Sequence, residues 1–464
     1  MDAVIALLIL YAGATFLNTV ISAILWISQK ALLYRALFFV WATVFFAFLI
    51  QAAIPPTAPP IVTVLGFAFV FVHNYALAHL IASTVGFKLP WRRFVIGMAV
   101  AIAGSLGAHF SGQSFFLIAI PTVLGLSSPL IFAAVRSLIQ WKTLTFASKG
   151  LAISCLFLFM HYLDYPILRP VPSMAQLGFT IAILLIFALS IFAPAVVLEI
   201  VADKQARIAT EMEVAHRIQM DILPRNPKIP GLEISCYMKP AEEVGGDYYD
   251  IYSFGNYSWI MVGDVTGHGL SSGLVMLMAQ SIISSILHTK KDITPGELNF
   301  LANKLLYQNL QRLKEDRSMT IVSICRKGDD TGYVFSGTHD NIYIYRAENG
   351  EVETINVGHI PAGLGFVDDL DRREFTEGGF RLHNHDLLFL GTDGVTEAAR
   401  EGDYRAGLFD EKRLIEFIKT NAKEPLDTIK SKLVSELDIY TKGVYHDDVT
   451  FVLARSVSPE VVRF

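Results

Sequence analysis

The sequence predicts a multi-domain chain: an all-helical membrane bundle of about seven spans, then an α+β globular domain of antiparallel strands flanked by helices. Residues 1–200 hold 9 Lys/Arg and 3 Asp/Glu, whereas residues 201–464 hold 29 and 40. A stretch so poor in charge has too little polar surface to face water. The second part has ordinary globular composition and alternates short β-like runs with helical stretches. We therefore expect a membrane domain over 1–200, a linker helix over 201–224 and a globular domain over 225–457.

The composition also excludes several classes of protein. Charge and hydrophobicity this uneven rule out a purely soluble or a disordered chain. The second part carries more acidic than basic residues, which excludes a nucleic-acid binder that relies on a basic surface. Cys155, Cys236 and Cys325 are too few and too scattered for a disulfide framework or a metal knuckle. Free thiols in a reducing compartment are the expectation.

Seven apolar runs are long enough to cross about 30 Å of hydrocarbon. They cover residues 3–27, 36–54, 61–86, 94–112, 115–135, 150–168 and 175–198. The first run lacks the basic segment and the small-residue cleavage site of a secretory signal. Asp164 and Pro166 interrupt the sixth run, and the segment HYLDYPILRP indicates a break that could help form a ligand site.

The distribution of Lys and Arg predicts the orientation of these spans. Eight basic residues fall in alternate loops on one side, against Arg169 alone on the other. The basic loops and the C-terminal domain are therefore expected in the cytoplasm, in a multi-pass protein of the inner membrane that contacts its lipid. Four histidines in or near the spans are interpreted as groups hydrogen-bonded within the bundle, and not as haem or metal ligands: His73, His79, His109 and His161.

Residues 196–223 contain no Gly or Pro and continue the last apolar run as a helix. An apolar residue recurs every seven positions, which predicts one seam of a coiled coil and a homodimer formed through this helix: Val201, Ile208, Ala215 and Ile222. The companion seam, Gln205, Met212 and Gln219, is poor. An amphipathic helix that packs on its own domain fits the pattern equally well.

The informative residues of the second part are aspartates at the ends of predicted strands. They are Asp247, Asp264, Asp393, Asp447 and Asp448. Gly beside three of these positions lets the backbone approach a bound group closely. If the strands lie side by side, the carboxylates repel one another and require cations, and oxygen-only ligands favour Mg²⁺ or Mn²⁺ over Zn²⁺. In the alternative interpretation, each aspartate merely ends a strand in a turn.

Five motifs carry a family resemblance: AHRIQMDILP, PAEEVGGDYYD, VGDVTGHGLSSGLVMLMA, LGTDGVTEA and HDDVTFVLAR, in this order. They resemble the SpoIIE-type (stage II sporulation protein E-like) branch of the PPM, or type 2C-like, metal-dependent Ser/Thr protein phosphatases. That branch includes the stress-response sigma-regulator phosphatases. The resemblance covers about residues 213–456. It implies a sandwich of two stacked β-sheets flanked by helices, with two Mn²⁺ or Mg²⁺ ions at its edge.

The resemblance also implies roles for individual residues. Asp247 would ligate the first metal, and Asp264 would bridge both with help from the backbone carbonyl of Val265. Asp393 and Asp447 would complete the second metal site, with Asp448 as the alternative ligand one residue further on.

Two histidines stand in family motifs. His268 is a candidate general acid, and a structural role in the Gly-rich turn is its alternative. Where the family often has Gly-His-x-Pro, this chain reads SGTHDNIY and keeps His339 without the proline. We interpret that departure as altered substrate contact.

The function implied is that of a membrane receptor phosphatase. Metal-activated hydroxide would attack the phosphorus of a phospho-Ser or phospho-Thr on an anti-sigma-factor antagonist or a related regulator. The membrane domain would control that activity through the linker helix. Two alternatives are a catalytically silent scaffold of the same fold and a transporter with a regulatory phosphatase appendage.

Overall fold

The computed structural model of the chain describes residues 2–30, 32–54, 58–225, 227–328, 331–358, 360, 363–367 and 369–457. It divides into two compact units, Met1–Arg207 and Ile208–Phe464.

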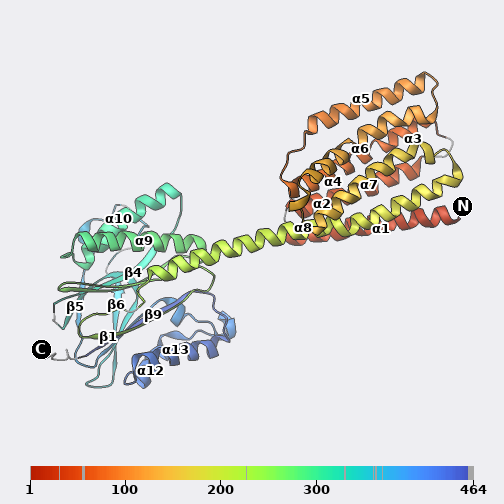
Figure 1. Ribbon diagram of the computed structural model, residues 1–464. Coiled ribbons are helices and arrows are strands. Elements are labelled where there is room, and N and C mark those ends of the chain that lie inside the picture. Colours follow the sequence, from red (N-terminus) through yellow and green to blue (C-terminus); the bar gives the residue numbers. More distant parts are fainter. Residues whose placement is uncertain are drawn as a thin grey trace. The chain divides into compact units, whose positions relative to one another are not determined.

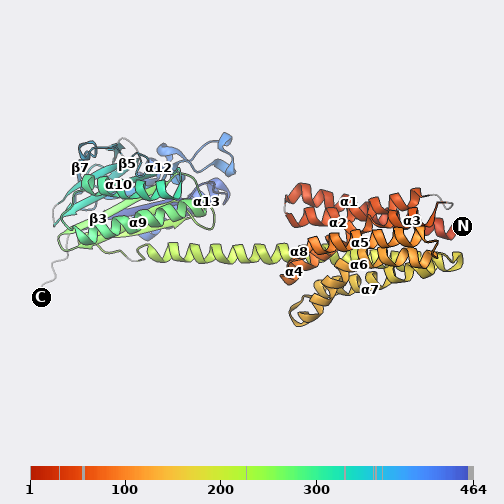
Figure 2. The same ribbon diagram turned by 90° about the horizontal axis from the view of Figure 1, so that it is seen from above.

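The first unit is a bundle of helices (Figure 1, Figure 2). Its helices are α1 (Asp2–Gln29), α2 (Leu32–Ala53), α3 (Pro60–Phe67), α4 (Val70–Val85), α5 (Trp91–Phe110), α6 (Phe115–Ile139), α7 (Phe146–Leu168) and α8 (Pro172–Ile222). Helix α6 packs against α4, α5 and α7. Each predicted apolar run coincides with a helix, except that the third is divided between α3 and α4 by a turn at Ala68 and Phe69.

Eight described helical stretches are long and apolar enough to cross a membrane by length and composition. Seven of them lie between Leu8 and Ile222 and match the seven predicted runs. The eighth, Leu270–Thr289, is a helix of the second unit, where it packs on a β-sheet.

The break predicted in the sixth run is wrong. Helix α7 continues through Pro166 and ends two residues later at Leu168. A proline in a helix removes one backbone hydrogen bond, and in an apolar bundle the neighbouring helices tolerate that loss. On the same helix, His161 Nδ1 lies 3.0 Å from Asp164 Oδ2. The segment HYLDYPILRP is therefore largely helical.

Polar side chains tie the bundle together. His73 Nδ1 lies 2.8 Å from the carbonyl oxygen of Val40. Asn74 Nδ2 donates to the carbonyl of Leu126 at 2.8 Å, and the hydroxyl of Tyr162 donates to Asn74 Oδ1 at 3.1 Å. These contacts join α2, α4, α6 and α7, as expected for interhelical hydrogen bonds in an apolar bundle. The interpretation of His73 as a hydrogen-bonded group is confirmed.

The predicted linker over 201–224 lies in the last part of α8, which continues the last apolar run to Ile222. From Met212 onward, one face of the helix packs on the rest of the second unit and buries Gln219, and Leu223 just after the helix is buried as well. Gln219 was assigned to the poor companion seam of a coil, whereas it faces its own domain. Own-domain packing thus holds for this half of the helix. Ile218 and Ile222 remain exposed on another face, and the homodimer stays a prediction.

In its described residues, the second unit is built on nine antiparallel strands. They are β1 (Leu232–Lys239), β2 (Tyr248–Phe254), β3 (Tyr257–Val265), β4 (Met319–Lys327), β5 (Gly332–Tyr345), β6 (Val352–Gly358), β7 (Gly378–Arg381), β8 (Leu387–Gly391) and β9 (Val449–Ser456). The strand order is β1-β9-β8-β5-β4-β3-β2, and β6 and β7 also pair with β5.

The two stacked sheets that the resemblance implied are one hydrogen-bonded sheet that curls at β5. The first part of β5 pairs with β4 and β7, and its last part pairs with β8 and β6. The register shifts between His339 and Ile342, where a bulge bends the strand. A single strand therefore belongs to both layers.

Three apolar cores fix the layers. Ile260 and Val262 of β3 point between the two layers, whereas Trp259 and Met261 point outward, as alternation along a strand requires. Helices α9 (Leu270–Thr289) and α10 (Pro295–Leu313) cover one layer. Helices α12 (Asp410–Asn421) and α13 (Leu426–Thr441) cover the other (Figure 1). The order is helices, sheet, sheet, helices.

Candidate active site and its carboxylates

The predicted site residues lie at strand ends in both layers. Asp247 precedes β2, and Asp264 and Val265 end β3. Asp393 begins the short helix α11 (Asp393–Thr396), just after β8, and Asp447 and Asp448 precede β9. Because β2 pairs with β3 and β8 pairs with β9, each pair of strands brings its own aspartates together.

Two hydrogen bonds bring the layers together at these ends. Thr392 Oγ1 donates to Asp247 Oδ2 at 2.9 Å, and the N–H of Gly246 donates to Asp448 Oδ2 at 2.5 Å. Thr392 stands in the chain beside Asp393. The motifs from distant parts of the sequence thus meet, and the aspartates do more than end their strands in turns.

The pKa values report the same proximity. Burial raises the pKa of Asp264 to about 8, with further contributions first from Asp393 and then from Asp447. Burial raises the pKa of Asp393 to about 7, again helped by the charge of Asp447. Burial, and then the charges of Asp264 and Asp448, raise the pKa of Asp247 well above its ordinary value. These carboxylates therefore disfavour each other's ionised forms, and a cation would relieve the repulsion.

The donor set fits hard divalent cations in chemistry. The candidate ligands are carboxylate oxygens and the carbonyl of Val265, which suit Mg²⁺ or Mn²⁺. A methyl group at Gly246 would lie 2.8 Å from that carbonyl oxygen, so the glycine lets the two strand ends approach. Among the described residues, however, no group of three or more His, Cys, Asp or Glu side chains stands ready to hold one metal ion. The carboxylates of the described residues lie in the same region, but they are not arranged as the ligands of one metal ion.

His268 lies between β3 and α9, on a turn with positive φ at Gly267 and Gly269. Its side chain is 60% exposed, and its Nδ1 lies 2.7 Å from Glu242 Oε1. Asp447 is within electrostatic range of His268, whose charge acts to lower the pKa of that carboxyl. Its role as general acid stays a prediction.

Three residues of the site were not found from the sequence. Asp340 is largely buried, and burial followed by the charges of Glu397 and Glu411 raises its pKa to about 6. The motif SGTHDN, singled out for its missing proline, contains it. Thr392 was inside a quoted motif, but nothing in the sequence shows that its hydroxyl reaches Asp247. The heptad spacing places Gln219 on the companion seam of a coiled coil, whereas its amide pairs with the backbone of Gly245.

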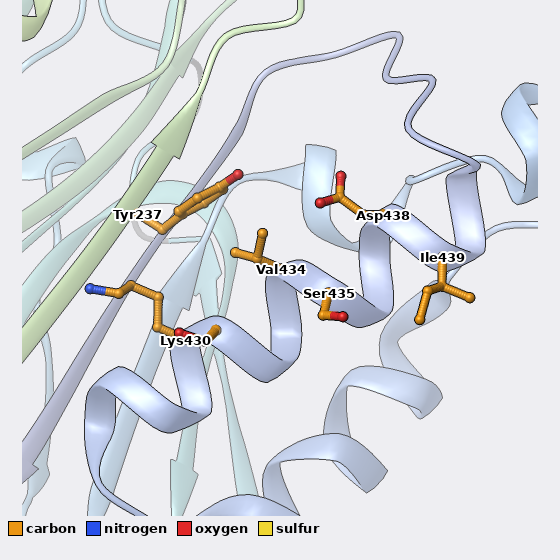
Figure 3. A pocket seen from close by; sticks show the side chains of 7 residues that line it. Tyr237, Lys430, Val434, Ser435, Asp438 and Ile439 are labelled. Atoms are coloured by element: carbon orange, nitrogen blue, oxygen red, sulfur yellow. The ribbon is translucent and has the colours of Figure 1, made fainter.

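The surface pockets lie elsewhere. One of about 490 Å³ lies between β1 and α13, where Tyr237 faces Lys430, Val434 and Asp438 (Figure 3). Another of about 590 Å³ is lined by the opposite ends of β3, β4 and β5. Within the described ranges, neither pocket is lined by a predicted metal ligand.

Comparison with known proteins agrees with the motifs. The sequence profile of the Stage II sporulation protein E (SpoIIE) family matches residues 255–457. Phosphoserine phosphatase RsbU of Bacillus subtilis is 26% identical over 256 residues, which are 54% of this chain and 71% of RsbU. Phosphoserine phosphatase RsbP of the same organism is 24% identical over 263 residues, 52% of this chain and 57% of RsbP.

Among solved structures, the SiaA-PP2C domain of Pseudomonas aeruginosa is similar at 21% identity. The structural match covers 55% of this chain and 99% of the SiaA-PP2C domain, with a TM-score of 0.47. The profile match over residues 255–457 and the two curated relatives support a SpoIIE-type PPM Ser/Thr phosphatase in this part of the chain.

Proposed function

We propose that this chain is a membrane-anchored protein phosphatase that removes phosphate from Ser or Thr of a cytoplasmic partner-switching regulator. The catalytic unit would hold two Mn²⁺ or Mg²⁺ ions, and the helical unit would control it. Two relatives are named phosphoserine phosphatases, which supports phosphoserine as the group attacked. An anti-sigma-factor antagonist is the class of substrate that the family resemblance favours.

The convergence of the aspartates carries this proposal. Asp264 is influenced by the charges of Asp393 and Asp447, which come from the other layer of the sandwich. Burying like charges together is unfavourable unless cations compensate them. In the proposed site, Asp247, Asp264 and the Val265 carbonyl would hold one ion, and Asp264, Asp393 and Asp447 would hold the second.

Each residue of the proposed site has its own task in catalysis. Divalent ions bound there would supply a water of lowered pKa and would offset the charge of the phosphate. Thr392 orients the Asp247 carboxylate through its hydroxyl. His268, paired with Glu242, would donate a proton to the leaving oxygen of Ser or Thr.

The control route runs through α8. Gln219 Nε2 donates to the carbonyl of Gly245 at 2.6 Å, and the N–H of Gly245 donates to Gln219 Oε1 at 3.1 Å. Gly245 is two residues from Asp247. Because α8 is continuous with the last apolar run, a shift or rotation of the helix in the membrane would reach the backbone beside a metal ligand. Seven apolar stretches, with the basic loops cytoplasmic, would anchor the protein in the inner membrane.

The test is phosphate release from a phosphoserine protein by the full-length chain in lipid nanodiscs, with and without Mn²⁺. Asp393→Asn should abolish release, whereas Asp427→Asn, an exposed aspartate at the start of α13, should not. Equal rates for wild type and Asp393→Asn would refute the metal assignment.

A second candidate function is a silent PPM-fold module that binds a regulator without hydrolysis. The lack of a ready three-ligand group among the described residues favours it. In that case the wild-type chain would bind no Mn²⁺ at millimolar concentration and would release no phosphate.

A further inference from the structure

The second aspartate of the Asp447–Asp448 pair has a different task from the first. We propose that Asp448 is a positioning residue that fixes the Asp247 loop, residues 241–247, and that it is not a metal ligand. This inference rests on the proposed function, because it assigns roles within the same site.

The contacts of Asp448 are made with the backbone of that loop. Its Oδ1 accepts the N–H of Ala241 at 2.7 Å. Its Oδ2 accepts the N–H of Gly246 at 2.5 Å and that of Asp247 at 3.4 Å. The side chain is buried, and both of its oxygens are engaged. Backbone N–H groups offset the negative charge of a carboxylate, so these donors take the place that a cation would occupy.

Close packing holds Asp448 in this position. A methyl group at Gly245 would lie 2.4 Å from Asp448 Oδ2, and one at Gly394 would lie 1.9 Å from the Asp448 carbonyl oxygen. Separations below about 3 Å do not occur for real side-chain carbons. Glycine at both places therefore lets the loop and the start of α11 close around Asp448.

Asp447 differs from its neighbour. Its Oδ1 accepts the N–H of Asp448 at 2.9 Å, and in the described part of the chain no hydrogen bond engages its other oxygen. A carboxylate with a free oxygen at the shared site is suited to a cation. In this proposal Asp447 binds a metal ion, and Asp448 fixes the backbone of the Asp247 loop.

Thr392 completes the support. Its Oγ1 donates to Asp247 Oδ2 at 2.9 Å and accepts the N–H of Thr450 at 3.2 Å. Asp448 therefore fixes the backbone of the Asp247 loop, and Thr392 fixes the Asp247 carboxylate. Both supports come from the β8–β9 layer, whereas Asp247 precedes β2 of the other layer. A ligand oriented in this way loses less conformational freedom when a metal binds.

The test compares two substitutions that keep size and remove charge, Asp448→Asn and Asp447→Asn, in the full-length protein. Hydrogen exchange in EDTA follows the amides of residues 241–247, with β4 as the internal reference. We expect Asp448→Asn to speed exchange in the loop by roughly tenfold, because Asn keeps only one acceptor oxygen. Asp447→Asn should leave loop exchange unchanged. Electron paramagnetic resonance then counts bound Mn²⁺, and only Asp447→Asn should lower the count.

A steric variant guards against general loss of structure. Gly245→Ala keeps every carboxylate but displaces Asp448, and it should speed exchange at Gly246 and Asp247 without lowering the Mn²⁺ count. Unchanged loop exchange in both Asp448→Asn and Gly245→Ala would overturn the proposal, as would loss of one Mn²⁺ in Asp448→Asn. If the wild type binds no Mn²⁺, the proposed phosphatase fails, while the exchange data still decide whether Asp448 holds the loop.

Discussion

Replacing Asp264 by Asn should stabilise the metal-free catalytic unit and abolish its activity. Asp264 is largely buried among like charges, and its pKa is raised from 3.8 to about 8. The described residues give its carboxylate no ion pair with Lys or Arg. Asn has nearly the same shape and cannot ionise, so the substitution removes the repulsion and little else.

The magnitude follows from proton linkage. A carboxyl group whose pKa is higher in the folded state binds more protons folded than unfolded, so stability falls as pH rises from about 4 to about 8. Each pKa unit corresponds to about 1.4 kcal/mol. At pH 7 this gives an upper limit of about 4 kcal/mol, and partial solvation and the neighbouring carboxylates reduce it to about 2–3 kcal/mol. Near pH 4 the difference between variant and wild type should vanish.

Hydrogen exchange of β3 and β4 in the full-length protein, measured in EDTA at several pH values, reports the free energy of unfolding of this unit. Asp386→Asn is the matched control. The Asp386 carboxylate is also buried, but it pairs with Arg346 Nη1 at 2.7 Å and accepts the N–H of Ala347 at 2.9 Å. Its loss should destabilise by about 1–3 kcal/mol. If Asp264→Asn were less stable than wild type at pH 8 without metal, the reasoning would be refuted.

Four further substitutions test other parts of the site. Gln219→Leu leaves the buried N–H and C=O of Gly245 unpaired and should weaken Mn²⁺ binding about tenfold in a titration, whereas the exposed Gln205→Leu should not. Thr392→Val should lower Mn²⁺ affinity without changing the number of ions bound; an unchanged affinity would remove its orienting role. Ile218→Lys places a charge on the face of α8 where Ile218 and Ile222 are exposed, and it should shift cross-linked dimers to monomers. A monomeric wild type would exclude the coiled coil. His268→Ala should slow phosphate release by about 10²–10⁴-fold if the imidazole donates the proton to the leaving oxygen, and a small change would indicate a structural role.

The convergence of the carboxylates could be predicted because each stands at a strand end in its own motif. The seven apolar runs could also be predicted, because the length of an apolar run and its low charge are properties of the local sequence. The curl of the sheet was not predictable, because it depends on β5 pairing with strands of both layers. That pairing is set by contacts far apart in sequence.

Other errors have local causes. A proline in an apolar run predicts a break, but in α7 packing in an apolar bundle overrides the loss of one hydrogen bond. Gln219 fitted a heptad position by spacing, whereas its amide pairs with the backbone of Gly245, which spacing cannot show. The sequence leaves Asp447 and Asp448 as alternative ligands, and the roles that we propose for them rest on the backbone N–H groups of the Asp247 loop, which bind Asp448.

Equilibrium dialysis of the full-length protein followed by metal analysis counts the Mn²⁺ ions that it binds, and so decides whether the aspartates form a two-metal site. We expect two ions per wild-type chain and fewer for Asp264→Asn, whose carboxylate both sites would share. A wild type that binds none at millimolar Mn²⁺, or an Asp264→Asn chain that binds as many as the wild type, would contradict it.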